Sequence, residues 1–243
     1  MRLITFAKRN FKEILRDPLN LSFLFGFPIV LLLLLSAIQA NIPVSMFEIE
    51  HLSPGIAVFG LAFLTLFSAT LIAKDRQSSL MHRLYTTPMT PVDFILGYTL
   101  PMLPIGLAEG VACYIFAAIL GLEISVNLLL SLILIIPIAL LYIGIGLLSG
   151  SILNDKQVGG ICGALLTNLS AWLSGIWFDL ELVGGTFQKI AYALPFVHAV
   201  ELERAALAGN FADIFPHLYW VLGYAAITLA AAVILFLRQM KNQ

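Results

Sequence analysis

The residues with the most chemical potential in this 243-residue chain lie close together near its C-terminal end. His198, Glu201, Glu203 and Arg204 fall within one short stretch, a mixture of residue types found in metal centres and hydrolases. Their spacing fits neither class, because the chain contains no His-Glu-x-x-His, no Gly-x-Ser-x-Gly and no adjacent Glu–Glu pair. We therefore expect no catalytic residue and no metal site. A structural polar cluster is expected instead, with Pro195, His198 and Arg204 as candidates for an extracellular gate.

Glu109 is the only carboxylate well inside a long apolar run. A charge at bilayer depth costs about 2.5–3.5 kcal/mol on insertion scales, so this side chain should face a bundle interior or stay protonated. One interpretation is a structural hydrogen bond to a neighbouring helix. The other places Glu109 in a substrate path or at a dimer seam, together with Gly159 and Gly163, whose spacing of four lets helices approach closely.

The composition places these residues in a membrane protein. The chain is 60% hydrophobic and 11% charged, with a mean hydropathy of +0.98, whereas soluble domains carry about 25% charged residues. Cys113 and Cys162 each lie inside an apolar run, which argues against a disulfide framework or a thiolate metal site.

Six apolar runs are long enough to span a bilayer, and none shows the alternation of a barrel strand. We predict an all-α integral membrane fold in a single transmembrane domain, residues 1–243. The first run exceeds the apolar core of a signal peptide and is interpreted as a retained anchor. The predicted spans are residues 19–40, 55–73, 96–122, 127–153, 158–178 and 219–237.

The distribution of basic residues gives an orientation. With the N-terminus in the cytoplasm, eleven Lys and Arg residues lie inside and only Lys189 and Arg204 lie outside, as the positive-inside rule requires. We therefore expect a multi-pass protein of a bacterial or archaeal plasma membrane with both termini in the cytoplasm.

Two further segments read as helices outside the spans. Residues 1–17 place Ile4, Phe11 and Ile14 on one helical face and basic residues on the other, which is typical of an interfacial amphipathic helix. Residues 179–217 contain helical patterning broken by prolines and glycines, so we expect short extracellular helices before the last span.

Residues 74–91 separate the second and third spans and predict a short cytoplasmic helix that ends at Pro88 and Pro91. Its apolar face could seat in a groove of another protein and its basic rim could steer that partner. A solvated connector lying on lipid headgroups fits the pattern equally well. The residues that would contact a partner are Arg76, Leu80, Met81, Arg83, Leu84, Tyr85, Thr87 and Pro88.

Two stretches together resemble a known family. "SSLMHRLYTTPMTPVDFILGYTL" resembles the segment after the second span of type 2 ATP-binding-cassette (ABC) exporter permeases, and "ALPFVHAVELERAALAG" resembles the segment before their last span. The first departs from the family pattern at Ser78–Ser79, where Gly–Thr is usual, and at His82, where an acid is usual. The residues that match are Leu80, Leu84, Thr86, Thr87, Pro88, Met89, Leu96 and Gly97, with Asp93 at an acidic position, and Leu194, Pro195, His198 and Arg204.

The resemblance implies a transport subunit that works as a homodimer or heterodimer with two copies of a separate ABC ATPase. That ATPase would bind ATP and Mg, since this chain has no phosphate-binding loop motif and needs no cofactor of its own. The helix between spans two and three would be the coupling helix. Membrane lipids are expected partners and nucleic acid is not. The expected cargo is an amphipathic or hydrophobic compound, such as a drug, an antibiotic or a lipid-like molecule.

Two other classes stay open at this point. An ion-coupled secondary transporter or channel would use Glu109 as its intramembrane ionisable site, although no inverted repeat is visible. An intramembrane enzyme would depend on His198 or Glu201.

Overall fold

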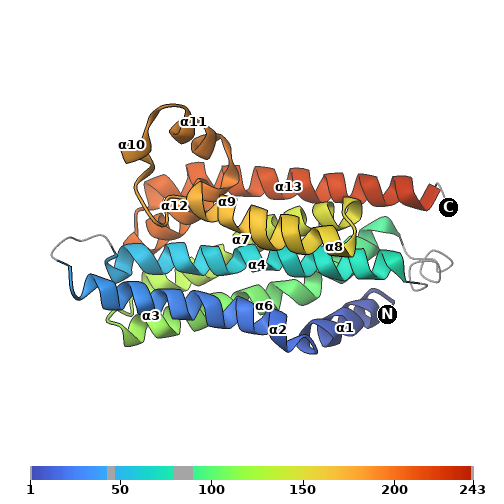
Figure 1. The fold of residues 1–243 in the computed structure, drawn as a ribbon, viewed down its shortest axis with the longest axis horizontal. Coiled ribbons are helices and arrows are strands. Elements are labelled where there is room, and N and C mark those ends of the chain that lie inside the picture. The colour runs from blue at the N-terminus through green and yellow to red at the C-terminus, as the bar shows by residue number, and fades with distance from the viewer. Residues whose placement is uncertain (1, 43–46, 79–89, 242–243) are drawn as a thin grey trace.

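A central helix, α4 (Ile49–Gln77), organises the fold, and the other long helices pack around it (Figure 1). In this computed structural model, residues 2–42, 47–78 and 90–241 are described, and these ranges contain helices and no strand. The remaining helices before α7 are α1 (Arg2–Leu15), α2 (Pro18–Leu21), η1 (Ser22–Gly26), α3 (Phe27–Gln39) and α6 (Pro91–Ile119). They are followed by α7 (Val126–Ile152), α8 (Asp155–Val158), η2 (Gly159–Leu166), α9 (Thr167–Trp172), α10 (Leu180–Val183), α11 (Gly185–Ala193), α12 (Pro195–Ala208) and α13 (Phe211–Lys241).

Five helical runs in the described part of the chain are long and apolar enough to cross a membrane. They correspond to five of the six predicted spans, with ends that differ by one to eight residues. The largest differences are at α4, which begins at Ile49 and ends at Gln77, and at α13, which begins at Phe211. The five runs are Pro18–Gln39, Ile49–Gln77, Val92–Ile119, Val126–Ile152 and Phe211–Arg238.

The predicted span 158–178 is not among these five runs. The structure has helix from Asp155 to Trp172, through α8, η2 and α9, and the chain then turns. The turn includes Gly175, whose φ of 71° is a left-handed conformation that glycine adopts without strain. The helical run therefore begins with charged residues and ends six residues earlier than the apolar pattern indicated.

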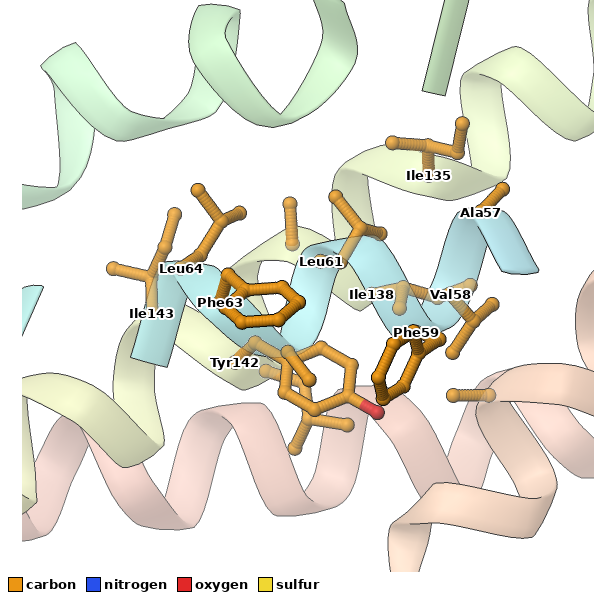
Figure 2. Packing of buried hydrophobic residues seen from close by; sticks show 14 of the residues in the cluster. Ala57, Val58, Phe59, Leu61, Phe63, Leu64, Ile135, Ile138, Tyr142 and Ile143 are labelled. Carbon is orange, nitrogen blue, oxygen red and sulfur yellow. The ribbon is translucent and has the colours of Figure 1, made fainter. Parts of the chain in front are cut away.

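Helices α4 and α7 pack against each other at the centre of the core. Apolar side chains from both helices interdigitate there, including Phe59, Leu61 and Ile138 (Figure 2). Gly146 and Gly150 of α7 bring the two backbones into close contact. A Cβ atom added at either glycine would lie 2.5 Å from a carbonyl oxygen of α4. The Gly-x-x-x-Gly spacing thus serves helix packing inside the protomer.

The predicted amphipathic helix is present as α1, and part of its surface is buried against other helices. Phe6, Asn10 and Ile14 are buried, whereas Ile4 is 69% exposed. The reason is that α1 packs on α6, where Phe6 lies against Tyr98 with ring centroids 5.0 Å apart.

The predicted helical segment at 179–217 is resolved into α10, α11, α12 and the first turns of α13. Helices α10 and α11 project at one end of the bundle, opposite the end where α1 starts and α13 finishes (Figure 1). Helix α12 is more deeply placed, because most of its residues are buried against α4, α7 and α13.

Candidate functional site

The segment predicted to meet a partner is flanked by two helix ends that are tied to α1. Asp75, in the last turns of α4, is only 3% exposed. Arg9 of α1 donates two hydrogen bonds to its carboxylate, Nη1 to Oδ2 at 2.6 Å and Nη2 to Oδ1 at 2.9 Å. Tyr98 of α6 donates a third, from Oη to Oδ2 at 2.9 Å. One carboxylate therefore joins α1, α4 and α6.

A second set of contacts strengthens the same junction. Asn10 is fully buried and donates from Nδ2 to the carbonyl oxygen of Gly97 at 3.0 Å. Gly97 leaves the space that the Phe6 ring occupies, since a Cβ there would lie 2.3 Å from that ring. We call the set of Arg9, Asn10, Asp75, Gly97 and Tyr98 the Arg9 cluster.

The electrostatics of the Arg9 cluster favour the ion pair. Partial burial lowers the pKa of a guanidinium, but the hydrogen bonds and the charge of Asp75 outweigh that effect and raise the pKa of Arg9. Bidentate arginine–carboxylate pairs are among the stronger and more directional polar contacts. The cluster is suited to keep three helix ends in a fixed relation.

The start of α6 is fixed by its own cap. Thr90 accepts a hydrogen bond from the Asp93 amide at 3.2 Å, and the Asp93 carboxylate accepts one from the Thr90 amide at 2.9 Å. This capping box explains the acid that the resemblance placed at position 93. The helix that follows residues 79–89 thus begins at a defined point.

Arg76 is the one predicted coupling residue that lies in the described part of the chain. It occupies the last turn of α4 and donates from Nη1 to the carbonyl oxygens of Gly150 at 2.8 Å and Leu153 at 3.2 Å. It therefore caps the end of α7. The other predicted coupling residues lie outside the described residues: Leu80, Met81, Arg83, Leu84, Tyr85, Thr87 and Pro88.

Glu109 faces the interior of the protomer. Its side chain is fully buried and Oε1 accepts a hydrogen bond from Cys113 Sγ at 3.0 Å. Gly60 of α4 makes room for the carboxyl group, because a Cβ at that position would lie 1.8 Å from Oε1. The other oxygen, Oε2, has no hydrogen-bond partner among the described residues.

A second buried carboxylate is Glu203, which the sequence analysis placed in a polar cluster with His198, Glu201 and Arg204. Glu203 of α12 is 0% exposed and accepts a hydrogen bond from Tyr114 Oη of α6 at 2.8 Å. Burial raises the pKa of Glu203 to about 8, although the hydrogen bond from Tyr114 lowers it. Only the three-dimensional packing reveals this contact, since the partners are 89 residues apart.

The two glycines proposed for a dimer seam face different ways. A Cβ at Gly159 would meet open space, whereas one at Gly163 would lie 3.3 Å from Leu66 of α4. Only Gly159 is on an outward surface of the protomer.

The predicted gate residues lie together at the α12 end of the bundle. Pro195 is the first residue of α12 and is buried. Arg204 is engaged by Glu201, with Nη1 donating to Oε1 at 2.7 Å, and by the carbonyl oxygen of Gly175 at 3.0 Å. His198 contacts His217, a residue that the sequence analysis did not single out.

An open pocket of about 670 Å³ adjoins this end. Its lining includes the Glu201–Arg204 pair and three aromatic side chains, those of Trp177, Phe178 and Tyr192. Within the described ranges, no group of three or more His, Cys, Asp or Glu side chains is arranged to hold a metal ion.

Comparison with known proteins adds one match. A family model described as ABC-2 type transporter matches residues 1–208. The matched region runs from α1 through α12 and includes the Arg9 cluster and both buried glutamates, whereas α13 follows it. No curated protein matches the sequence.

Proposed function

The chain belongs to the ABC-2 type transporter family, and from that premise we propose that it is the membrane subunit of an ABC exporter driven by a separate ATPase. The family match supports a permease that operates with an ABC ATPase. We propose two ATPase copies per complex and outward transport. The observation that carries the mechanism is the Arg9 cluster, which joins the two helix ends around residues 79–89.

We propose six membrane crossings. The start of α1 and the end of α13 lie at the same end of the bundle (Figure 1), so an even number of crossings is needed. Five spanning helices are present, and the run 155–172 lies along α4 and would cover about 27 Å at 1.5 Å per residue. The charge distribution supports placing both termini in the cytoplasm.

Force from the ATPase would enter through residues 79–89 and reach the core through α4. The Arg9 cluster holds the end of α4 to α1 and α6, and Arg76 holds it to the end of α7. Because these contacts involve buried or half-buried groups, the helix ends should move together instead of bending separately. Displacement of residues 79–89 would therefore shift the spans as a unit.

We propose an amphipathic or hydrophobic cargo that leaves past residues 179–217. The pocket at that end is within the usual volume range of small-molecule sites and has aromatic walls from Trp177, Phe178 and Tyr192. Helix α12, which begins at Pro195 and contains His198 and Arg204, borders this route and supports a gating role for these three residues.

The complex would be completed by a second protomer in the same membrane. The outward face of η2 and α9 presents Gly159, Ile161, Leu165 and Trp172, of which Leu165 is 56% exposed. Small and apolar residues on one helical face suit helix–helix contact in lipid. We propose this face as the dimer seam.

Co-purification tests the proposal. The chain is expressed with its genomic neighbours, and the material purified in detergent is examined for a bound ATPase. Replacing Leu84 and Tyr85 by Glu should abolish recovery of the ATPase, since charges would oppose seating of an apolar face. The matched control is Leu84→Met with Tyr85→Phe, which should keep the ATPase bound. Equal recovery from both double variants would refute the coupling role.

The unpaired oxygen of Glu109 is the one observation that favours an ion-coupled alternative. Purified protein in liposomes without any ATPase discriminates between the two. Uphill transport that stops when the proton gradient is collapsed would support the alternative and exclude the ABC mechanism.

A further inference from the structure

Two imidazole rings meet at the junction of α11, α12 and α13. His198 Nδ1 of α12 and His217 Nδ1 of α13 are 2.9 Å apart. His198 Nε2 lies 3.0 Å from the carbonyl oxygen of Tyr192 in α11. His198 also stacks on Trp220 of α13, with ring centroids 4.7 Å apart and an interplanar angle of 11°. One histidine ring therefore bridges three helices.

The contacts determine where the protons lie. A carbonyl oxygen only accepts hydrogen bonds, so His198 Nε2 must carry a proton. In the neutral ring His198 Nδ1 is then an acceptor, and His217 Nδ1 must donate to it. The short Nδ1–Nδ1 contact has room for one proton.

The order of further protonation follows from this arrangement. A first added proton goes to His217 Nε2, which leaves the His217 Nδ1–H bond to His198 in place and strengthens it by adding charge. A second must go to His198 Nδ1. Both nitrogens of the contact would then be donors on two cationic rings, and the contact would break.

The groups around the two histidines bear on this order of protonation. Burial opposes the first protonation, whereas the charged groups that act on the pair, Glu201 of α12 and Asp213 of α13, favour it. Burial lowers the pKa of His198, and the neighbouring His217 lowers it further, which delays the second protonation. The phenol of Tyr192 faces His198 from α11.

We propose that His198 and His217 form a proton-sensitive latch that holds α11 and α12 against α13 and releases them when both rings are charged. This regulatory role goes beyond the proposed transport function, because it concerns a conformational equilibrium of the chain itself. The latch stays closed with one added proton and opens with the second, at a pH below the ordinary imidazole range. In transport it would let an acidic exterior loosen the α10–α11 end.

Spin labels test the latch without requiring transport. Cysteines at Ile190 in α11 and Leu222 in α13, both exposed, are labelled in the full chain with Cys113 and Cys162 replaced by Ala. Labelled protein is diluted with unlabelled protein in lipid nanodiscs. The distance distribution between the labels is then measured by electron spin resonance from pH 8 to pH 4.5.

We expect one distance at neutral pH and a second, longer population at acidic pH. His217→Phe cannot place two charges at the contact, so its distribution should not respond to pH. His217→Asn keeps a donor for His198 Nδ1 and should keep the closed distance at every pH. The inference is overturned if the parent protein does not respond to acid, or if His217→Phe responds as the parent does. Neither result bears on whether an ATPase drives transport.

Discussion

Removing the charge of Asp75 gives a direct test of the Arg9 cluster. Asp75→Asn keeps the size of the side chain but leaves Arg9 facing a neutral amide. The matched control is Glu13→Gln, which removes the other carboxylate paired with the same guanidinium. Glu13 lies one turn away, with N–O distance 2.8 Å, and its side chain is 47% exposed, against 4% for that of Asp75.

The expected magnitude follows from burial. Removing one partner of a buried ion pair destabilises proteins by about 3–5 kcal/mol. The side chain of Arg9 is 34% exposed, so water and Glu13 recover part of this loss. We therefore expect Asp75→Asn to lower the free energy of unfolding by about 2–3 kcal/mol. Glu13→Gln should lower it by about 1 kcal/mol or less, as for exposed pairs.

Thermal unfolding of the purified chain in one detergent measures both changes. For a chain of this length, 1 kcal/mol corresponds to a midpoint shift of about 2–4 °C. The Asp75 variant should therefore unfold about 4–12 °C below the parent, and the Glu13 variant should stay within about 4 °C. If the two variants unfold at the same temperature, the Arg9 cluster does not hold the helix ends together. A second readout is the number of ATP molecules hydrolysed per cargo molecule in the reconstituted complex, which should rise only for Asp75→Asn.

Two further variants probe the buried carboxylates. Gly60→Ala places a Cβ 1.8 Å from Glu109 Oε1 and should cost about 1–3 kcal/mol of stability, whereas Gly223→Ala, with open space around it, should not. The cost should shrink in a Glu109→Ala background, and a denaturation cycle in which the two effects simply add would contradict the contact. Glu203 holds its proton in the folded chain up to its pKa of about 8, but loses it near 4.5 when unfolded, so stability should fall as pH rises between these values. The free energy of unfolding should fall by up to about 1.4 kcal/mol per pH unit. Melting curves of Glu203→Gln should lack this pH dependence, and a variant that keeps the slope of the parent would refute the role of Glu203.

The helical spans were largely predictable because hydrophobic length is a property of the sequence alone. Five predicted spans correspond to long helices, although α4 extends beyond its apolar core to include Asp75. Hydropathy cannot detect that extension, because the charge of Asp75 is satisfied by residues from other helices. The predicted span 158–178 extends beyond the helix that ends at Trp172, because the residues after Trp172 are largely apolar although the chain turns there, with Gly175 in a left-handed conformation.

The side-chain contacts of the site were much less predictable. Arg9 and Asp75 are 66 residues apart, and Tyr114 and Glu203 are 89 apart. Neither pair shares a local pattern that would place the partners together. Asn10 was not singled out by the sequence analysis, and this polar residue of α1 is fully buried. Such residues become recognisable only when the packing of α1 on α6 is known.

The position of α4 explains why a partner bound at residues 79–89 would influence the whole bundle. Its glycine-mediated contact with α7 leaves no layer of side chains between the backbones, and Thr65 Oγ1 donates a hydrogen bond to the Tyr142 carbonyl oxygen at 2.9 Å. Sliding α4 past α7 would force backbone atoms together, so the two helices must move as one body. Arg76 adds a hydrogen-bonded tie between the same helices at their ends. A displacement of the end of α4 should therefore move α7 with it. It should also reach α12, because α12 packs directly on α4 and α7.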